Sequence, residues 1–124
     1  MDAWTTIHVI NHDPAVRDSL KLLLELCGHR VEAYGSGECY LLDPAPPRAI
    51  GRHCILLDLD MPGMGGFEML EALRGQGSAS PVIVITGRGN GVRPRIEAAG
   101  AALLEKPFGQ SALLACIDAV LAGR

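Results

Sequence analysis

Residues 53–66 read HCILLDLDMPGMGG, and this stretch decides the fold. It opens with an apolar run, CILL at residues 54–57, that stops at the carboxylate of Asp58, and a loop rich in Gly, Pro and Met follows. A continuous apolar run bounded by turn residues is typical of a strand buried on both faces of a parallel sheet. Ligands and chemistry gather outside the carboxyl ends of such strands, so Asp58 is the candidate functional centre.

The rest of the chain alternates strand patterns with helix patterns. The first strand, TTIHVI, is followed by Asp13 and Pro14, an N-cap and a first helical residue, and Gly28 ends that helix. The remaining predicted strands cover residues 30–34, 82–85 and 101–104, and the remaining predicted helices cover residues 37–42, 67–73, 93–99 and 111–121. Five strands alternating with five helices, joined by right-handed crossovers, predict an α/β fold with a doubly wound parallel sheet.

Two segments of the chain favour irregular structure. Residues 43–52 contain Pro44, Pro46 and Pro47, which predicts a loop that leads into the Asp58 strand. Residues 88–92 are rich in glycine and are expected to be mobile, and Pro94 fits only the first turn of the helix that follows. No stretch has the character of a linker, so a single domain is expected over residues 1–124.

Composition restricts the classes of partner. The net charge of −3 offers no electrostatic reason for direct nucleic-acid binding. The N-terminal residues lack the basic head and apolar stretch of a signal peptide, and no run approaches the ~18 apolar residues of a membrane span. We therefore expect a cytoplasmic protein with no membrane partner. The four scattered cysteines each lie in or beside an apolar segment, which predicts buried free thiols in a reducing compartment.

Polar side chains follow four of the predicted strands. Asn11 and His12 come after the first, Asp58 after the third, Thr86 after the fourth and Lys106 after the fifth. Because these ends share one edge of the sheet, the side chains are expected to converge on one pocket. A carboxylate, a hydroxyl and an ammonium around a shallow site suit phosphoryl chemistry, with the carboxylate attacking phosphorus and the other two holding the phosphoryl oxygens.

Four motifs occur in order along the chain, at spacings in register with the α/β pattern. They are DPAVRDSL at residues 13–20, LLDLDMPGMGG at 56–66, IVITGRG at 83–89 and EKPF at 105–108. On these motifs the chain resembles the receiver domain of two-component response regulators, over nearly all of its 124 residues. The resemblance implies a flavodoxin-like (βα)5 fold with strand order 2-1-3-4-5. It also implies a phosphoacceptor domain rather than an enzyme, capable at most of slow self-dephosphorylation.

The resemblance assigns a role to each residue of the pocket. Asp58 matches the phosphoacceptor for a sensor histidine kinase or phosphotransfer protein, Thr86 the switch hydroxyl and Lys106 the invariant lysine. Asp60 matches the position whose backbone carbonyl helps to hold Mg²⁺, and its side chain is expected to face solvent. The resemblance also implies a cis peptide bond between Lys106 and Pro107.

The sequence departs from the family pattern in ways that bear on function. Asn11 and His12 replace two adjacent acidic residues that hold Mg²⁺ together with Asp58, and neither replacement is a good ligand for a hard cation. We therefore expect weak Mg²⁺ binding or none. Leu103 replaces the aromatic residue that usually accompanies the switch hydroxyl. The fourth helix is short, and it forms one face of the domain together with the fifth helix. Family members use this face to bind output domains or partners or to form homodimers.

Three functions compete. The first is a receiver that accepts a phosphoryl group on Asp58 in a phosphorelay. The second is a pseudo-receiver, in which the fold serves as a protein-interaction module without phosphorylation. The third, a flavodoxin-like nucleotide-binding protein, is disfavoured because no loop after the first strand offers the glycine or hydroxyl cluster that cradles a phosphate. Retained Asp58, Thr86 and Lys106 favour the first function.

Overall fold

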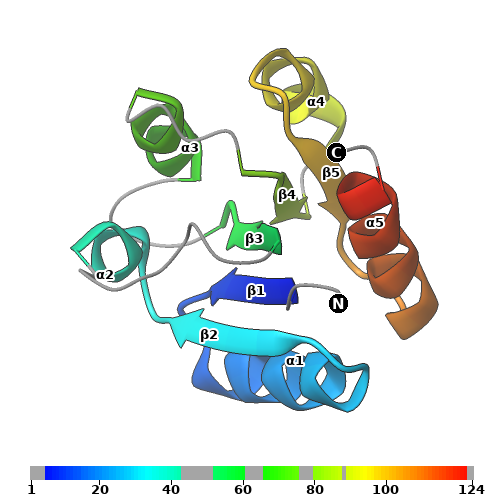
Figure 1. Cartoon of the computed structure of the whole chain (residues 1–124). Coiled ribbons are helices and arrows are strands. Elements are labelled where there is room, and N and C mark those ends of the chain that lie inside the picture. The colour runs from blue at the N-terminus through cyan, green and yellow to red at the C-terminus, as the bar shows by residue number, and fades with distance from the viewer. Residues whose placement is uncertain (1–4, 43–51, 61–65, 76–79, 88, 123–124) are drawn as a thin grey trace.

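The fold is a five-stranded parallel sheet covered by helices on both faces (Figure 1), as expected from the sequence. The computed structural model describes residues 5–42, 52–60, 66–75, 80–87 and 89–122. The strands are β1 (Thr5–Ile10), β2 (Arg30–Tyr34), β3 (Arg52–Asp58), β4 (Val82–Thr86) and β5 (Ala102–Glu105). The helices are α1 (Pro14–Leu26), α2 (Gly37–Leu42), α3 (Gly66–Gly75), α4 (Gly89–Ala98) and α5 (Gln110–Ala122).

The strands lie in the order β2-β1-β3-β4-β5, which confirms the predicted topology. Ile10 lies opposite Leu57, Asp58 opposite Ile85, and Thr86 opposite Glu105. The central strands therefore end at nearly the same level. This register brings the residues that follow β1, β3, β4 and β5 to one edge of the sheet.

Two hydrophobic clusters fill the spaces between sheet and helices. Side chains alternate between the faces of a strand, and β3 accordingly sends Ile55 and Leu57 to one cluster and Cys54 and Leu56 to the other. The first cluster packs against α2, α3 and α4, and the second against α1 and α5. Burial on both faces explains why β3 and β4 are nearly continuous apolar runs.

Helix α1 begins and ends where its sequence predicts. The Asp13 carboxylate accepts hydrogen bonds from the backbone N–H groups of Ala15 and Val16, and Pro14 is the first helical residue. Gly28 has a φ of 94°, a conformation that glycine adopts without steric cost, and the chain leaves the helix there. The cap fixes the end of the loop that carries Asn11 and His12.

The fourth helix is present, but its expected start and the expected position of Pro94 within it were wrong. Residues 89–92, expected to be mobile, form the first turns of α4, and Pro94 lies inside the helix rather than in its first turn. Packing explains the difference: Val92 and Ile96 lie one turn apart, and both contact the cluster that α3 also contacts. The Arg95 guanidinium lies 3.7 Å from the centroid of the Phe67 ring and adds a contact between α4 and α3.

Other expectations are tested only in part. The predicted loop before β3 lies outside the described residues except for Arg52, which already belongs to the strand. The glycine loop after Asp60, at residues 61–65, also lies outside them. Within the described part of the chain, no helix combines the length and hydropathy needed to cross a membrane.

The cysteines are less uniformly buried than expected. Cys54 is buried in β3 and Cys116 is partly buried, whereas Cys27 and Cys39 are exposed. Cys27 follows the last turn of α1 and Cys39 lies on the outer side of α2, so an apolar neighbourhood in sequence did not place them in a core. Burial, with a smaller contribution from nearby Cys116, raises the pKa of the Cys54 thiol to about 12.

This difference predicts selective thiol modification. Only the thiolate is reactive, and the raised pKa keeps Cys54 protonated below about pH 12. Ellman's reagent at pH 8 should therefore modify the exposed Cys27 and Cys39 rapidly. It should modify Cys54 only after unfolding. Peptide mapping of the labelled protein checks this. Labelling in guanidinium chloride, where every cysteine should react, is the control, and rapid labelling of Cys54 in native protein would contradict the packing of β3.

Candidate functional site

Asp58 is a nearly inaccessible carboxylate at the end of β3. Its exposed fraction is 2%, and its Oδ1 atom accepts a hydrogen bond of 2.9 Å from the backbone N–H of Asp60 and one of 3.2 Å from the Lys106 ammonium. A buried carboxylate is costly unless it is paired and hydrogen-bonded. These two donors satisfy that requirement from within the protein.

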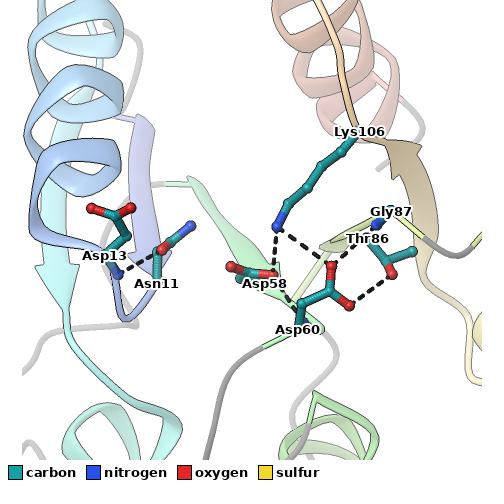
Figure 2. A network of polar contacts seen from close by, with 7 residues as sticks. All are labelled: Asn11, Asp13, Asp58, Asp60, Thr86, Gly87 and Lys106. Carbon is teal, nitrogen blue, oxygen red and sulfur yellow. Dashed lines mark hydrogen bonds and ion pairs between the residues drawn. The ribbon is translucent and has the colours of Figure 1, made fainter.

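Lys106 reaches Asp58 from the end of β5. Its backbone N–H donates to the Thr86 carbonyl at 2.9 Å, which ties the end of β5 to the end of β4, and the Lys106–Pro107 peptide bond is cis. The ammonium lies 3.2 Å from Asp58 Oδ1 and 3.5 Å from Asp60 Oδ2. One cation therefore serves two carboxylates (Figure 2).

The Asp60 side chain lies in the site, and the expectation that it would face solvent was wrong. Its Oδ1 accepts a hydrogen bond of 3.1 Å from the Thr86 hydroxyl, and its Oδ2 accepts one of 3.1 Å from the Gly87 backbone N–H. Thr86 is fully buried, so its hydroxyl needs a partner within the protein. The sequence held one signal for this contact. Asp60 is an acidic residue only two positions after Asp58, and Thr86 and Lys106 are expected at neighbouring strand ends.

The two residues after β1 stand apart from this group. The Asn11 side chain is 4% exposed and its Oδ1 accepts a hydrogen bond of 2.9 Å from the Asp13 backbone N–H, while His12 is exposed. Figure 2 shows the Asn11–Asp13 contact beside the cluster of Asp58, Asp60, Thr86 and Lys106 but not joined to it. The described residues include no group of three His, Cys, Asp or Glu side chains that could hold a metal ion.

This donor set does not fit a strong site for a hard cation. Mg²⁺ prefers several charged oxygen ligands in octahedral geometry. The β1 end supplies an amide oxygen already engaged by Asp13 and an exposed imidazole, and Asp58 is the nearby carboxylate on that side. The Asp60 carboxylate contacts Thr86, Gly87 and Lys106 instead.

Leu103 lies in the middle of β5, opposite Val84. It is half-buried and packs against the cluster that includes Ile96 of α4. Leu103 therefore lies on β5 next to the strand that ends at Thr86, and it contacts the same cluster as α4.

The assembled group can bind and attack an electrophilic anion. A carboxylate can act as a nucleophile, and an ammonium, a hydroxyl and a backbone N–H aimed at one position stabilise negative charge there. Residues 7–118 match the family model described as the response regulator receiver domain. The chain belongs to this family. As a receiver domain, it is a signalling domain rather than a catalytic one.

Relatives and solved structures agree with this assignment. The receiver is 43% identical over 118 residues to the transcriptional regulatory protein FixJ of Azorhizobium caulinodans, covering 93% of this chain and 54% of the relative. It is 32% identical over 123 residues to the response regulator protein TodT of Pseudomonas putida, covering 97% of this chain and 52% of the relative. The chain thus spans about half the length of the curated relatives it matches.

Among solved structures, the receiver superposes on the N-terminal part of FixJ with a TM-score of 0.84 and 28% identity, covering 100% of this chain and 98% of that one. It superposes on the response regulator StyR with a TM-score of 0.85 and 34% identity, covering 97% of this chain and 60% of that one. Receiver domains act with histidine kinases and output domains and generally use Mg²⁺ for phosphorylation.

Lys106 should be a stabilising residue because two carboxylates depend on its charge. The substitution Lys106→Met should lower the free energy of unfolding by roughly 1–2 kcal/mol, since Asp58 and Asp60 then lose their shared cation. Adding Asp58→Asn should recover most of this loss. Urea denaturation of the single and double variants measures both effects, with Lys21→Met on exposed α1 as a control that should change stability by less than about 0.5 kcal/mol. Equal stability of Lys106→Met and the wild type would contradict the pairing.

Proposed function

We propose that this receiver accepts a phosphoryl group on Asp58 from a histidine kinase or phosphotransfer protein. The observation that supports the proposal is the convergence of the Lys106 ammonium, the Thr86 hydroxyl and the Gly87 N–H beside the Asp58 carboxylate. These groups retain the chemistry needed for phosphoryl transfer, which favours a phosphoacceptor over a pseudo-receiver. Residues 1–124 act in this proposal as one domain.

The transfer needs few protein groups. A carboxylate oxygen of Asp58 forms a bond to phosphorus while the phosphorus–nitrogen bond of a phosphohistidine breaks, and the imidazole leaves with the bonding electrons. Lys106 offsets the negative charge on the phosphoryl oxygens, and Thr86 and Gly87 supply neutral donors. Later hydrolysis of the acyl phosphate returns Asp58 and inorganic phosphate.

Thr86 links the site to the α4 face. It is the last residue of β4, and its neighbour across the β4–β5 pairing is Glu105, two residues beyond Leu103. We assign Thr86 and Leu103 the switch positions: movement of the hydroxyl toward a phosphoryl oxygen would alter the packing of Leu103 and Ile96. A leucine can respond by changing rotamer, although it lacks the polar tip of an aromatic tyrosine.

The metal requirement should be weaker than is usual in the family. If Mg²⁺ binds, Asp58 and the Asp60 backbone carbonyl would hold it with Asn11, and it would offset charge on the phosphoryl group. Asn11 and His12 provide no carboxylate for it. Lys106 is therefore the principal cation at Asp58.

The partners of the whole protein follow from its relatives and its surface. The matched relatives are about twice as long as this chain, and the proposed output is a further domain or a partner protein. The proposed contact surface, which could also form a homodimer, is the face of α4, β5 and α5. Exposed Arg93 pairs there with Glu97 at 3.6 Å and with Glu105 at 3.2 Å. The net charge of −3 argues against direct nucleic-acid binding by this domain.

Phosphorylation should be confined to Asp58. Incubation with acetyl phosphate and Mg²⁺, followed by intact-mass analysis, should show one phosphoryl adduct that is absent from Asp58→Asn. Asp118→Asn, an exposed carboxylate on α5, is the matched control and should retain the adduct. An adduct that persists in Asp58→Asn would contradict the assignment.

Restoring the acidic pair should create a metal site. The wild type should show little Mg²⁺ occupancy at millimolar concentrations, and Asn11→Asp with His12→Asp should bind Mg²⁺ on the order of ten- to a hundredfold more tightly, because charged oxygen ligands set affinity. Phosphoryl uptake should accelerate in the same variant. Calorimetry measures the binding, and tight Mg²⁺ binding by the wild type would show that Asn11 and His12 do not replace metal ligands.

A further inference from the structure

The Asp60 side chain occupies three of the donors that the proposed function assigns to the phosphoryl group. The Thr86 hydroxyl and the Gly87 N–H each donate to one of its oxygens at 3.1 Å, and the Lys106 ammonium lies 3.5 Å from Oδ2. The Asp60 backbone is engaged separately, through its N–H, with Asp58 Oδ1 at 2.9 Å. Side chain and backbone of this residue therefore act on different parts of the site.

These donors form a binding site for an anion, and a carboxylate fills it in the absence of a ligand. A phosphoryl group on Asp58 would present oxygens that need the same hydroxyl, N–H and ammonium. The hydroxyl and the N–H each carry one hydrogen, so the Asp60 carboxylate and a phosphoryl group would compete for these donors. Figure 2 shows the Asp60 carboxylate lying between Thr86 and Lys106, on the side of Asp58 away from Asn11.

We infer that Asp60 is an internal competitor of the phosphoryl group: its carboxylate holds Thr86, Gly87 and Lys106 before phosphorylation and must leave them as Asp58 is phosphorylated. This inference rests on the proposed function and adds a positioning residue to it. It follows that Asp60 slows phosphoryl uptake. It also follows that the unphosphorylated receiver already holds the Thr86 hydroxyl on an anion.

The negative charge of Asp60 and its competition for the donors would both slow phosphoryl uptake. Phosphodonors are anions, and a second carboxylate beside Asp58 repels them while sharing the one lysine that would attract them. Displacing the Asp60 carboxylate costs its charge-assisted hydrogen bonds, each of which corresponds to about a tenfold change in an equilibrium. Because the side chain is 27% exposed, solvent can accept the displaced carboxylate.

The test compares rates of phosphoryl uptake. Wild type, Asp60→Ala and Asp60→Asn are incubated with acetyl phosphate at one fixed Mg²⁺ concentration, and adduct formation is followed by intact mass. In this step an Asp58 oxygen bonds to phosphorus, the phosphorus–oxygen bond to acetate breaks, and acetate leaves with the electrons. The matched control is Glu105→Gln, which also removes one negative charge beside Lys106 but from a carboxylate that pairs with Arg93.

Asp60→Ala should accept the phosphoryl group on the order of tenfold faster than wild type. Asp60→Asn should be intermediate, because its single uncharged amide oxygen can replace only one of the two oxygens that accept from Thr86 and Gly87. Glu105→Gln should stay within about twofold of wild type. Adduct formation at equal rates in wild type and Asp60→Ala overturns the inference alone, whereas no adduct in any protein overturns the proposed function and the inference with it.

A measurement on the unphosphorylated protein tests the contact itself. In ¹H–¹⁵N spectra, the Gly87 amide proton should move upfield in Asp60→Ala, because it loses its carboxylate acceptor, and should not move in Glu105→Gln. An unchanged Gly87 resonance overturns the inference. Mg²⁺ binding that calorimetry detects in the wild type and not in Asp60→Ala would also overturn it, since the carboxylate would then serve a metal ion.

Discussion

A carboxylate buried at the end of a two-sided strand must be neutralised from inside the protein, and this constraint organises the receiver. Asp58 is the last residue of β3, which is buried from Cys54 onward, and is itself 2% exposed, so water has little access to its charge. One of the two donors is local, the N–H of Asp60 just beyond the strand end, whereas the neutralising cation, Lys106, follows β5 and is distant in sequence. Parallel register across β3, β4 and β5 brings them together.

The charges around Asp58 are redistributed relative to the usual family arrangement. Two carboxylates are replaced on the β1 side by Asn11 and His12, and one carboxylate, that of Asp60, lies on the Thr86 and Lys106 side. The negative charge of Asp60 thus lies close to the groups proposed to bind phosphoryl oxygens rather than to those that would bind a metal ion. The weak metal binding proposed above and the occupied anion site would both result from this change in the position of the charges.

The sequence was sufficient for the strands and for the polar residues that follow them. Apolar runs bounded by turns located β3 and β4, and the Asp13-Pro14 cap located the start of α1. The convergence of Asp58, Thr86 and Lys106 then followed from topology, because parallel strand ends share an edge. Neither the site residues nor their order required knowledge of side-chain rotamers.

What could not be predicted depends on contacts between distant elements. The Asp60 side chain turns inward because Thr86 and Gly87 offer donors there, and no local pattern at residues 58–60 encodes that. Helix α4 extends to Gly89 because Val92 and Ile96 find a cluster to contact, which outweighs the poor helix propensity of glycine and proline. Exposed Cys27 and Cys39 show the same dependence on the final packing.

The alternation of the two clusters along β3 also restricts how the chain can change in length. Residues 54, 56 and 58 share one face of the strand, and residues 55 and 57 share the other, so the face on which Asp58 lies is fixed by the face on which each core residue of β3 lies. Deleting one residue within β3 would exchange the faces of every side chain before it, whereas deleting two would preserve them. Length variation in this receiver should therefore be confined to the connections or occur in even steps within its strands.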